Sequence, residues 1–118
     1  MADFCGSIEN LCVRRGDSPI IGIIVKDDQL TAVDISGYSF LMTVDPSPAP
    51  SSNANNLFQV VGVIADAANG RVTFQPSTVN TDQSPGVYFY DIQMITTASS
   101  KRTLLSGEFE IRQDITKD

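Results

Sequence analysis

Residues 86–94 read Gly-Val-Tyr-Phe-Tyr-Asp-Ile-Gln-Met, and this stretch decides the fold that we expect for the whole chain. Every second side chain is large and apolar, which is the pattern of a β-strand with one face buried in a core. The predicted inward residues of this strand are Tyr88, Tyr90, Ile92 and Met94. The opposite face carries Asp91, Gln93 and Thr97, and we expect it to face solvent.

Three apolar side chains interrupt that outer face: Val87, Phe89 and Ile95. Single apolar residues are common on protein surfaces, whereas a row of them on one strand can mark a docking site. We therefore take Val87, Phe89 and Ile95 as candidate protein-interaction residues.

Residues 102–112 continue the alternation and predict the antiparallel partner of this strand. The predicted inward residues of the partner are Leu105, Gly107, Phe109 and Ile111. The polar residues 97–101 would join the two strands, and Ser84-Pro85-Gly86 would form the turn that leads into the first. We therefore expect a long β-hairpin in the C-terminal part of the chain.

Shorter strands are predicted at residues 10–15, 20–26, 38–45, 57–65 and 71–76, which are separated by turn signals. The predicted inward side chains of these strands include Ile21, Ile23, Val25, Tyr38, Phe40, Met42, Val44, Val72 and Phe74. Asn69-Gly70 suits a hairpin turn between the last two. Residues 46–56 contain three prolines and no large apolar side chain, which predicts an exposed loop. The polar residues 77–83 suit one helical turn.

About seven short strands without helical periodicity predict an all-β, immunoglobulin-like antiparallel β-sandwich, with an open barrel as the alternative. The spacing Gly86-x-Tyr88-x-Tyr90 is similar to the approach to the sixth strand of such sandwiches, where a tyrosine hydroxyl bonds to upstream backbone. We expect residues 10–118 to form a single domain. Residues 1–9 lack alternation and predict an N-terminal arm that contacts a neighbouring subunit through Phe4 and Ile8.

Composition limits the classes of function. The chain has 118 residues, of which 42% are hydrophobic, and this is enough for one core without metal or disulfide support. Eight basic residues against fourteen acidic ones give a net charge of -6, which argues against nucleic-acid binding through phosphate neutralisation. The sequence has no apolar run of membrane-spanning length and no secretory signal pattern at its start, so we expect no membrane partner and folding in the cytoplasm.

Residues that support catalysis or metal binding are scarce. The chain has no histidine, and its two cysteines, Cys5 and Cys12, do not have the spacing of a zinc site. We expect both to be free thiols in the cytoplasm, whereas export would allow a disulfide between them. The acidic pair Asp27-Asp28 suits a solvated turn, since neighbouring side chains on a strand diverge. We therefore expect no catalytic residue, no cofactor and no metal site, and predict that the chain is not an enzyme.

The tetrapeptide Arg15-Gly16-Asp17-Ser18 has the sequence that integrins recognise in cell-adhesion proteins. It stands where a predicted strand ends, and Gly-Asp-Ser followed by proline is ordinary turn chemistry. We therefore interpret it as a turn, and keep a host- or cell-surface adhesion module as a second alternative function.

Four sequence blocks carry a family resemblance that covers about residues 11 to 116. They are residues 13–19 (Val-Arg-Arg-Gly-Asp-Ser-Pro), 33–38 (Val-Asp-Ile-Ser-Gly-Tyr), 86–93 (Gly-Val-Tyr-Phe-Tyr-Asp-Ile-Gln) and 103–111 (Thr-Leu-Leu-Ser-Gly-Glu-Phe-Glu-Ile), the last leading to Asp-Ile-Thr at 114–116. In these blocks the chain resembles small immunoglobulin-like structural proteins of tailed bacteriophages, including the N-terminal domain of baseplate upper proteins. The resemblance implies a virion component with a binding and architectural role.

In the baseplate-type proteins this domain is normally followed by a longer chain, whereas the sequence here ends at Asp118. That difference favours a capsid decoration or cement protein that docks on the assembled shell, with a tail or baseplate adaptor as the alternative. The arm and the apolar row would provide repeated weak contacts on a symmetric particle. We therefore expect a homo-oligomer, with a trimer as the expected state, that is assembled in the host cytoplasm and located in the virion.

Overall fold

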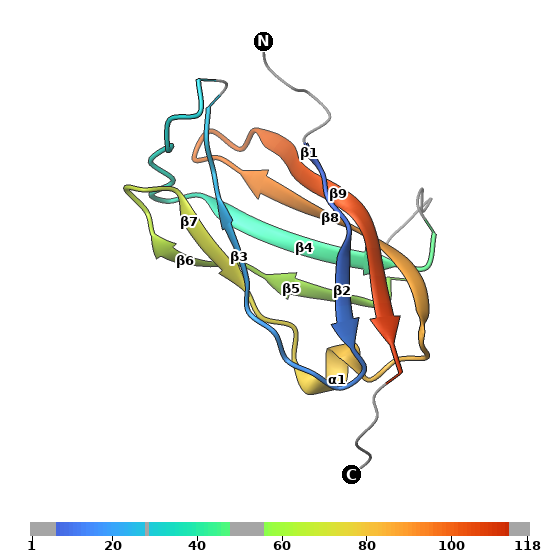
Figure 1. Cartoon of the computed structure of the whole chain (residues 1–118). Coiled ribbons are helices and arrows are strands. Elements are labelled where there is room, and N and C mark those ends of the chain that lie inside the picture. The colour runs from blue at the N-terminus through green and yellow to red at the C-terminus, as the bar shows by residue number, and fades with distance from the viewer. Residues whose placement is uncertain (1–6, 28, 48–55, 114–118) are drawn as a thin grey trace.

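The computed structural model describes residues 7–27, 29–47 and 56–113, which form mostly β-structure with one short helix (Figure 1). In chain order the elements are β1 (Ser7–Ile8), β2 (Leu11–Arg14), β3 (Ile21–Ile24), β4 (Ser39–Asp45), β5 (Phe58–Val61), β6 (Val63–Asp66), β7 (Arg71–Phe74), α1 (Thr78–Thr81), β8 (Gly86–Ile95) and β9 (Lys101–Arg112). The predicted all-β class is confirmed, and α1 is the helical turn predicted within residues 77–83.

The strands form two sheets (Figure 1). The larger sheet has the order β1-β9-β8-β4-β5, and β2 also pairs with β9. This sheet is mixed, because β1 and β2 run parallel to β9 while its other pairs are antiparallel, and it curls like half of a barrel. The smaller sheet is antiparallel, in the order β3-β7-β6. Since β1 and β2 share one register along β9, they act as one interrupted edge strand, and the described chain then has eight strands instead of about seven.

One hydrophobic core joins the two sheets. Its buried residues include Phe40, Met42 and Val44 of β4, Val72 and Phe74 of β7, Tyr90, Ile92 and Met94 of β8, and Phe109 and Ile111 of β9. The inward face of β8 is therefore the predicted one. Near the centre, the Phe109 ring makes edge-to-face contacts with Phe58, at 5.8 Å between centroids, and with Tyr90, at 6.3 Å. These contacts bind β5, β8 and β9 into one layer of the core.

The predicted strand at residues 57–65 is divided into β5 and β6, which belong to different sheets. The division falls at Gly62, where a Cβ atom would lie 2.8 Å from both the Cβ of Phe40 and the ring of Phe74. Only glycine lets the backbone pass this close to the two aromatic residues. The prediction of a single strand was therefore wrong, because the chain crosses here from the larger sheet to the smaller one.

The hairpin between β6 and β7 turns at Gly70, which has a positive φ of 67°. A Cβ atom at this position would lie 2.6 Å from the carbonyl oxygen of Val25, so glycine is required for space as well as for conformation. The carbonyl oxygen of Gly70 also accepts a hydrogen bond from the Val25 N–H at 2.8 Å. The turn predicted from Asn69-Gly70 is therefore present, and its glycine also binds the segment that follows β3.

The buried carboxylate of Asp45 joins the two ends of the predicted loop at residues 46–56. Asp45 Oδ1 accepts a hydrogen bond from the Ser47 N–H at 2.8 Å, and its Oδ2 accepts one from the Asn56 side-chain amide at 2.7 Å. Residues 48–55 of that loop lie outside the described residues. The contacts of Asp45 therefore hold Ser47 and Asn56 at the end of the larger sheet where β4 stops and β5 begins.

Candidate interaction surfaces

The predicted docking row lies on the outer face of β8. Val87 is 51% exposed, while Phe89 and Ile95 are half-buried. In the register of β8 with β9, Val87 is paired with Glu110 and Phe89 with Glu108, and paired residues of neighbouring strands share a face of the sheet. The structure therefore brings Val87 and Phe89 together with two carboxylates, and Ile95 lies farther along the same strand.

Asp91 stands between Phe89 and Ile95 on this face, and is paired with Thr43 of β4 and Ser106 of β9. Partial burial raises the pKa of the Asp91 carboxyl above its ordinary value. A partner that covers this face must therefore either hydrogen-bond to Asp91 or remove a charge from water at a cost. A suitable partner surface has apolar groups opposite Val87 and Phe89 and donors or positive charge opposite the carboxylates.

Of the two predicted anchors of the N-terminal arm, Phe4 lies outside the described residues and Ile8 is placed only as a backbone position. Ser7 and Ile8 form β1, and Ile8 is paired with Ser106 of β9. The next residue, Glu9, donates its N–H to the Ser106 carbonyl at 2.8 Å. The end of the predicted arm thus binds the β9 strand of its own chain.

Tyr90 fixes the same segment from inside the core. Its hydroxyl donates a hydrogen bond to the Glu9 carbonyl oxygen at 2.6 Å, across 81 positions of sequence. Burial, and to a smaller extent the nearby charge of Glu9, raises the pKa of Tyr90 to about 12. The phenol therefore stays neutral over the physiological pH range and serves as a buried donor for the start of the domain.

A second apolar surface, which was not predicted from the sequence, lies where the chain crosses between the sheets. Val61 at the end of β5 is 71% exposed, and Val63 at the start of β6 is 65% exposed. Gln59 and Ala65 are also exposed, so every second side chain from residue 59 to residue 65 faces solvent. This alternation was visible in the sequence, but its faces could be assigned only once the sheet order was known.

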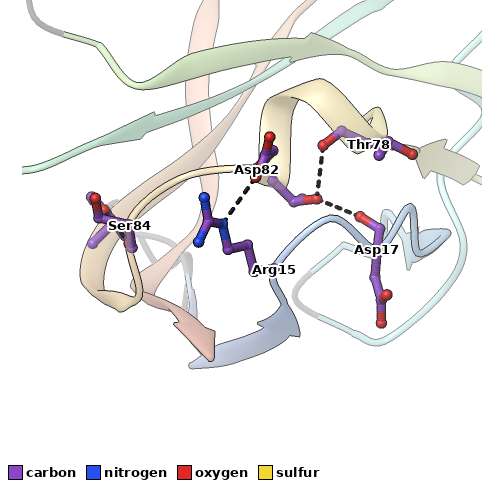
Figure 2. Close-up of polar contacts among 7 residues, drawn as sticks. Arg15, Asp17, Thr78, Asp82 and Ser84 are labelled. Atoms are coloured by element: carbon purple, nitrogen blue, oxygen red, sulfur yellow. Dashed lines mark hydrogen bonds and ion pairs between the residues drawn. The ribbon is translucent and has the colours of Figure 1, made fainter. Parts of the chain in front are cut away.

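The Arg-Gly-Asp-Ser segment is bound to the region around α1 by side-chain and backbone contacts (Figure 2). Arg15 Nε lies 2.9 Å from Asp82 Oδ1, and both side chains of this ion pair are partly exposed. The buried Thr81 hydroxyl donates to the Asp17 carbonyl oxygen at 2.6 Å, and the Ser18 hydroxyl donates to the Pro76 carbonyl oxygen at 2.7 Å. These contacts give the tetrapeptide a structural role: it forms the turn that follows β2 and is held against the α1 region.

The other residues considered for chemistry lie apart. Asp27 closes a turn, and its Oδ1 accepts from the Gln29 N–H at 2.9 Å and the Thr31 N–H at 3.0 Å, while Asp28 lies outside the described residues. Cys12 is exposed on β2, and Cys5 also lies outside them, so the state of the two thiols stays a prediction. Within residues 7–27, 29–47 and 56–113 there is no group of three or more histidine, cysteine or acidic residues placed to hold a metal ion.

The same described residues include no helix with the length and hydrophobicity of a membrane span. Comparison with known proteins found no matching family model and no matching curated protein.

Proposed function

We propose that this chain is a non-enzymatic structural protein of a bacteriophage virion, which decorates the assembled capsid through the outer face of its larger sheet. The observation that carries the proposal is the outer-face row of exposed Val87 and half-buried Phe89 beside Glu108 and Glu110. A strand face that mixes apolar and charged side chains suits contact with another protein. The resemblance of four sequence blocks to structural proteins of tailed bacteriophages supports a virion surface as the partner.

We also propose an immunoglobulin-like architecture, and three features support it. The order β9-β8-β4-β5 corresponds to the sheet of strands G, F and C with one added strand, and β3-β7-β6 corresponds to strands B, E and D. The Tyr88 hydroxyl donates to the Ser84 carbonyl oxygen at 2.6 Å, which is the upstream contact expected for a tyrosine near the sixth strand. The chain crosses between the sheets at Gly62, which separates β5, the strand added to the first sheet, from β6, which corresponds to strand D of the second.

A decoration protein must bind the assembled shell more tightly than isolated capsid subunits. In that setting each copy contributes a weak contact, and symmetry repeats it over the particle. The carboxylates near Phe89 would select a shell surface with positive or hydrogen-bond-donating groups. A tail or baseplate adaptor would use the same face on a different part of the particle, and location distinguishes these two roles.

The test is sedimentation of purified chain with phage particles that lack it. Val87→Glu adds a like charge beside Glu110 at a half-exposed position, so we expect the fold to persist and shell binding to weaken by about ten-fold or more. Val79→Glu is the matched control, because Val79 is 78% exposed and lies on α1, outside the strands that carry the docking row. Equal binding by wild type and Val87→Glu would refute the proposed docking face, and binding only to isolated capsid subunits would refute the decoration role.

A further inference from the structure

Among the described residues, no strand pairs with the outer edge of β5 in the larger sheet. The opposite edge of that sheet is the interrupted strand formed by β1 and β2, which ends on the charged residue Arg14. Natural edge strands are usually protected by charges, proline or bulges, since open N–H and C=O groups invite another strand. β5 reads Phe-Gln-Val-Val and has none of these protections, while Val61 at its end is 71% exposed.

The hydrogen-bond pattern identifies the backbone groups that face outward. The Gly62 N–H donates to the Phe40 carbonyl at 2.9 Å, and Val60 is paired with Met42 in the same register. In an antiparallel pair, alternate residues direct both backbone groups toward the partner strand, and the residues between direct theirs away. Val60 therefore bonds toward β4, and Gln59 and Val61 direct their N–H and C=O groups to the open edge.

We propose that two copies of the chain pair through β5, antiparallel and centred on Val60. In this register Gln59 of one copy lies opposite Val61 of the other, and the outward groups of both residues form about four main-chain hydrogen bonds across the junction. Val60 lies opposite its own copy at the symmetry axis. On the outer face, each exposed Val61 covers the stem of a Gln59 side chain and loses contact with water.

The charge distribution favours a second copy as the occupant. β5 carries no charged residue, so two β5 strands can approach without direct repulsion, although the chain as a whole has a net charge of -6. The carboxylates of the outer face, Asp91, Glu108 and Glu110, lie on β8 and β9, with β4 between them and β5. A twofold strand pair closes on itself, so the proposal predicts a dimer instead of the trimer expected from the sequence.

This pairing does not depend on the virion role, because it uses the β5 edge of the larger sheet, whereas the Val87 and Phe89 row lies on the outer face of β8. The two proposals therefore fail separately. Loss of shell binding with an intact dimer affects only the function, and a monomer that still binds the shell affects only the pairing.

The experiment measures the mass of the full chain by analytical ultracentrifugation between about 1 and 100 µM, a range that detects weak association. We expect wild type to dimerise, and expect Val61→Lys to weaken dimerisation by about ten-fold or more through charge repulsion at the junction. Gln59→Pro removes an N–H that faces outward, so it should block pairing while leaving the bonds to β4 intact. Val79→Lys is the control, since it makes the same change at an exposed position of α1, outside both the larger sheet and the Val87 and Phe89 row.

A cysteine variant tests the register. Directly opposed residues of a non-hydrogen-bonded antiparallel pair have Cα atoms about 4.5 Å apart, which suits a disulfide. In a chain whose Cys5 and Cys12 are replaced by serine, Val60→Cys should form a covalent dimer on mild oxidation, and Val79→Cys on α1 should not. A wild-type monomer at about 100 µM, a trimer, or a dimer unaffected by both Val61→Lys and Gln59→Pro would overturn the proposal.

Discussion

Replacement of Gly107 by alanine tests how the start of the domain is held on β9. A Cβ atom at Gly107 would overlap the carbonyl oxygen of Glu9 and approach the Asn10 side chain at 3.0 Å. Three hydrogen bonds depend on this close approach: Glu9 N–H to the Ser106 carbonyl at 2.8 Å, the Tyr90 hydroxyl to Glu9 at 2.6 Å, and Glu108 N–H to Asn10 Oδ1 at 3.0 Å. The added methyl group can be accommodated only if this segment moves away from β9.

Each of these bonds contributes about 0.5–1.5 kcal/mol, so we expect Gly107→Ala to lower the free energy of unfolding by about 2–4 kcal/mol. Gly86→Ala is the matched control, because Gly86 lies in β8 without a positive φ, and no atom lies within 4 Å of the position that its Cβ would occupy. A reduced chain entropy of the unfolded state should leave that control unchanged or about 0.4–1 kcal/mol more stable.

Urea titration measures both free energies, and hydrogen exchange of the N-terminal peptide shows whether β1 has been released. We expect faster exchange in residues 7–10 of Gly107→Ala and unchanged exchange there in Gly86→Ala. The reasoning is refuted if the two variants have equal stability and the N-terminal peptide exchanges as slowly as in wild type, because β9 would then tolerate a side chain beneath Glu9.

Three further predictions concern the core and the turn after β2. Phe109→Ala should cost about 3–5 kcal/mol in a urea titration, because its fully buried ring packs on two aromatic rings, and a loss under about 1 kcal/mol would contradict this packing. Folding favours the neutral form of Tyr90, so its contribution to the free energy of unfolding is complete below pH 10. That contribution falls by at most about 1.4 kcal/mol per pH unit as the pH rises toward the pKa of about 12. Tyr90→Phe should lack this pH dependence when urea titrations are compared across the same pH range. Thr81→Val should lower the free energy of unfolding by about 1–3 kcal/mol, because the Asp17 carbonyl loses its donor. Arg15→Ala should lower it by less than about 1 kcal/mol, because the ion pair of Arg15 is partly exposed. A larger loss for Arg15→Ala than for Thr81→Val would contradict this account of the turn.

The sequence predicted the long strands well because their alternation is local. Tyr90, Ile92 and Met94 are buried as expected, and Phe109 is buried in the facing strand. The division of residues 57–65 was not predictable in the same way. A glycine inside a strand signals a close approach, but the two aromatic residues that approach Gly62 come from β4 and β7, and no local pattern identifies them.

The same difference between local pattern and the order of strands decides which candidate surfaces were predictable from the sequence. Alternation was sufficient to place Val87 and Phe89 on an outer face, since neighbouring side chains of a strand point to opposite sides. The open edge of β5 depends on the order of strands in the sheet, and the contact between Tyr90 and Glu9 joins residues 81 positions apart. The role of the Arg-Gly-Asp-Ser turn likewise depends on Thr81, which the sequence offered only as part of a polar helical turn.

The number and position of copies in the virion test the proposed role most directly. Electron cryo-microscopy of particles produced from the genome that encodes this chain, combined with quantitative mass spectrometry of the same preparation, gives both. A decoration protein requires on the order of hundreds of copies arranged over the head, since the symmetric shell repeats its binding site. About a dozen copies confined to the tail would instead support the adaptor role. Particles that contain no copy of the chain would contradict the virion role altogether.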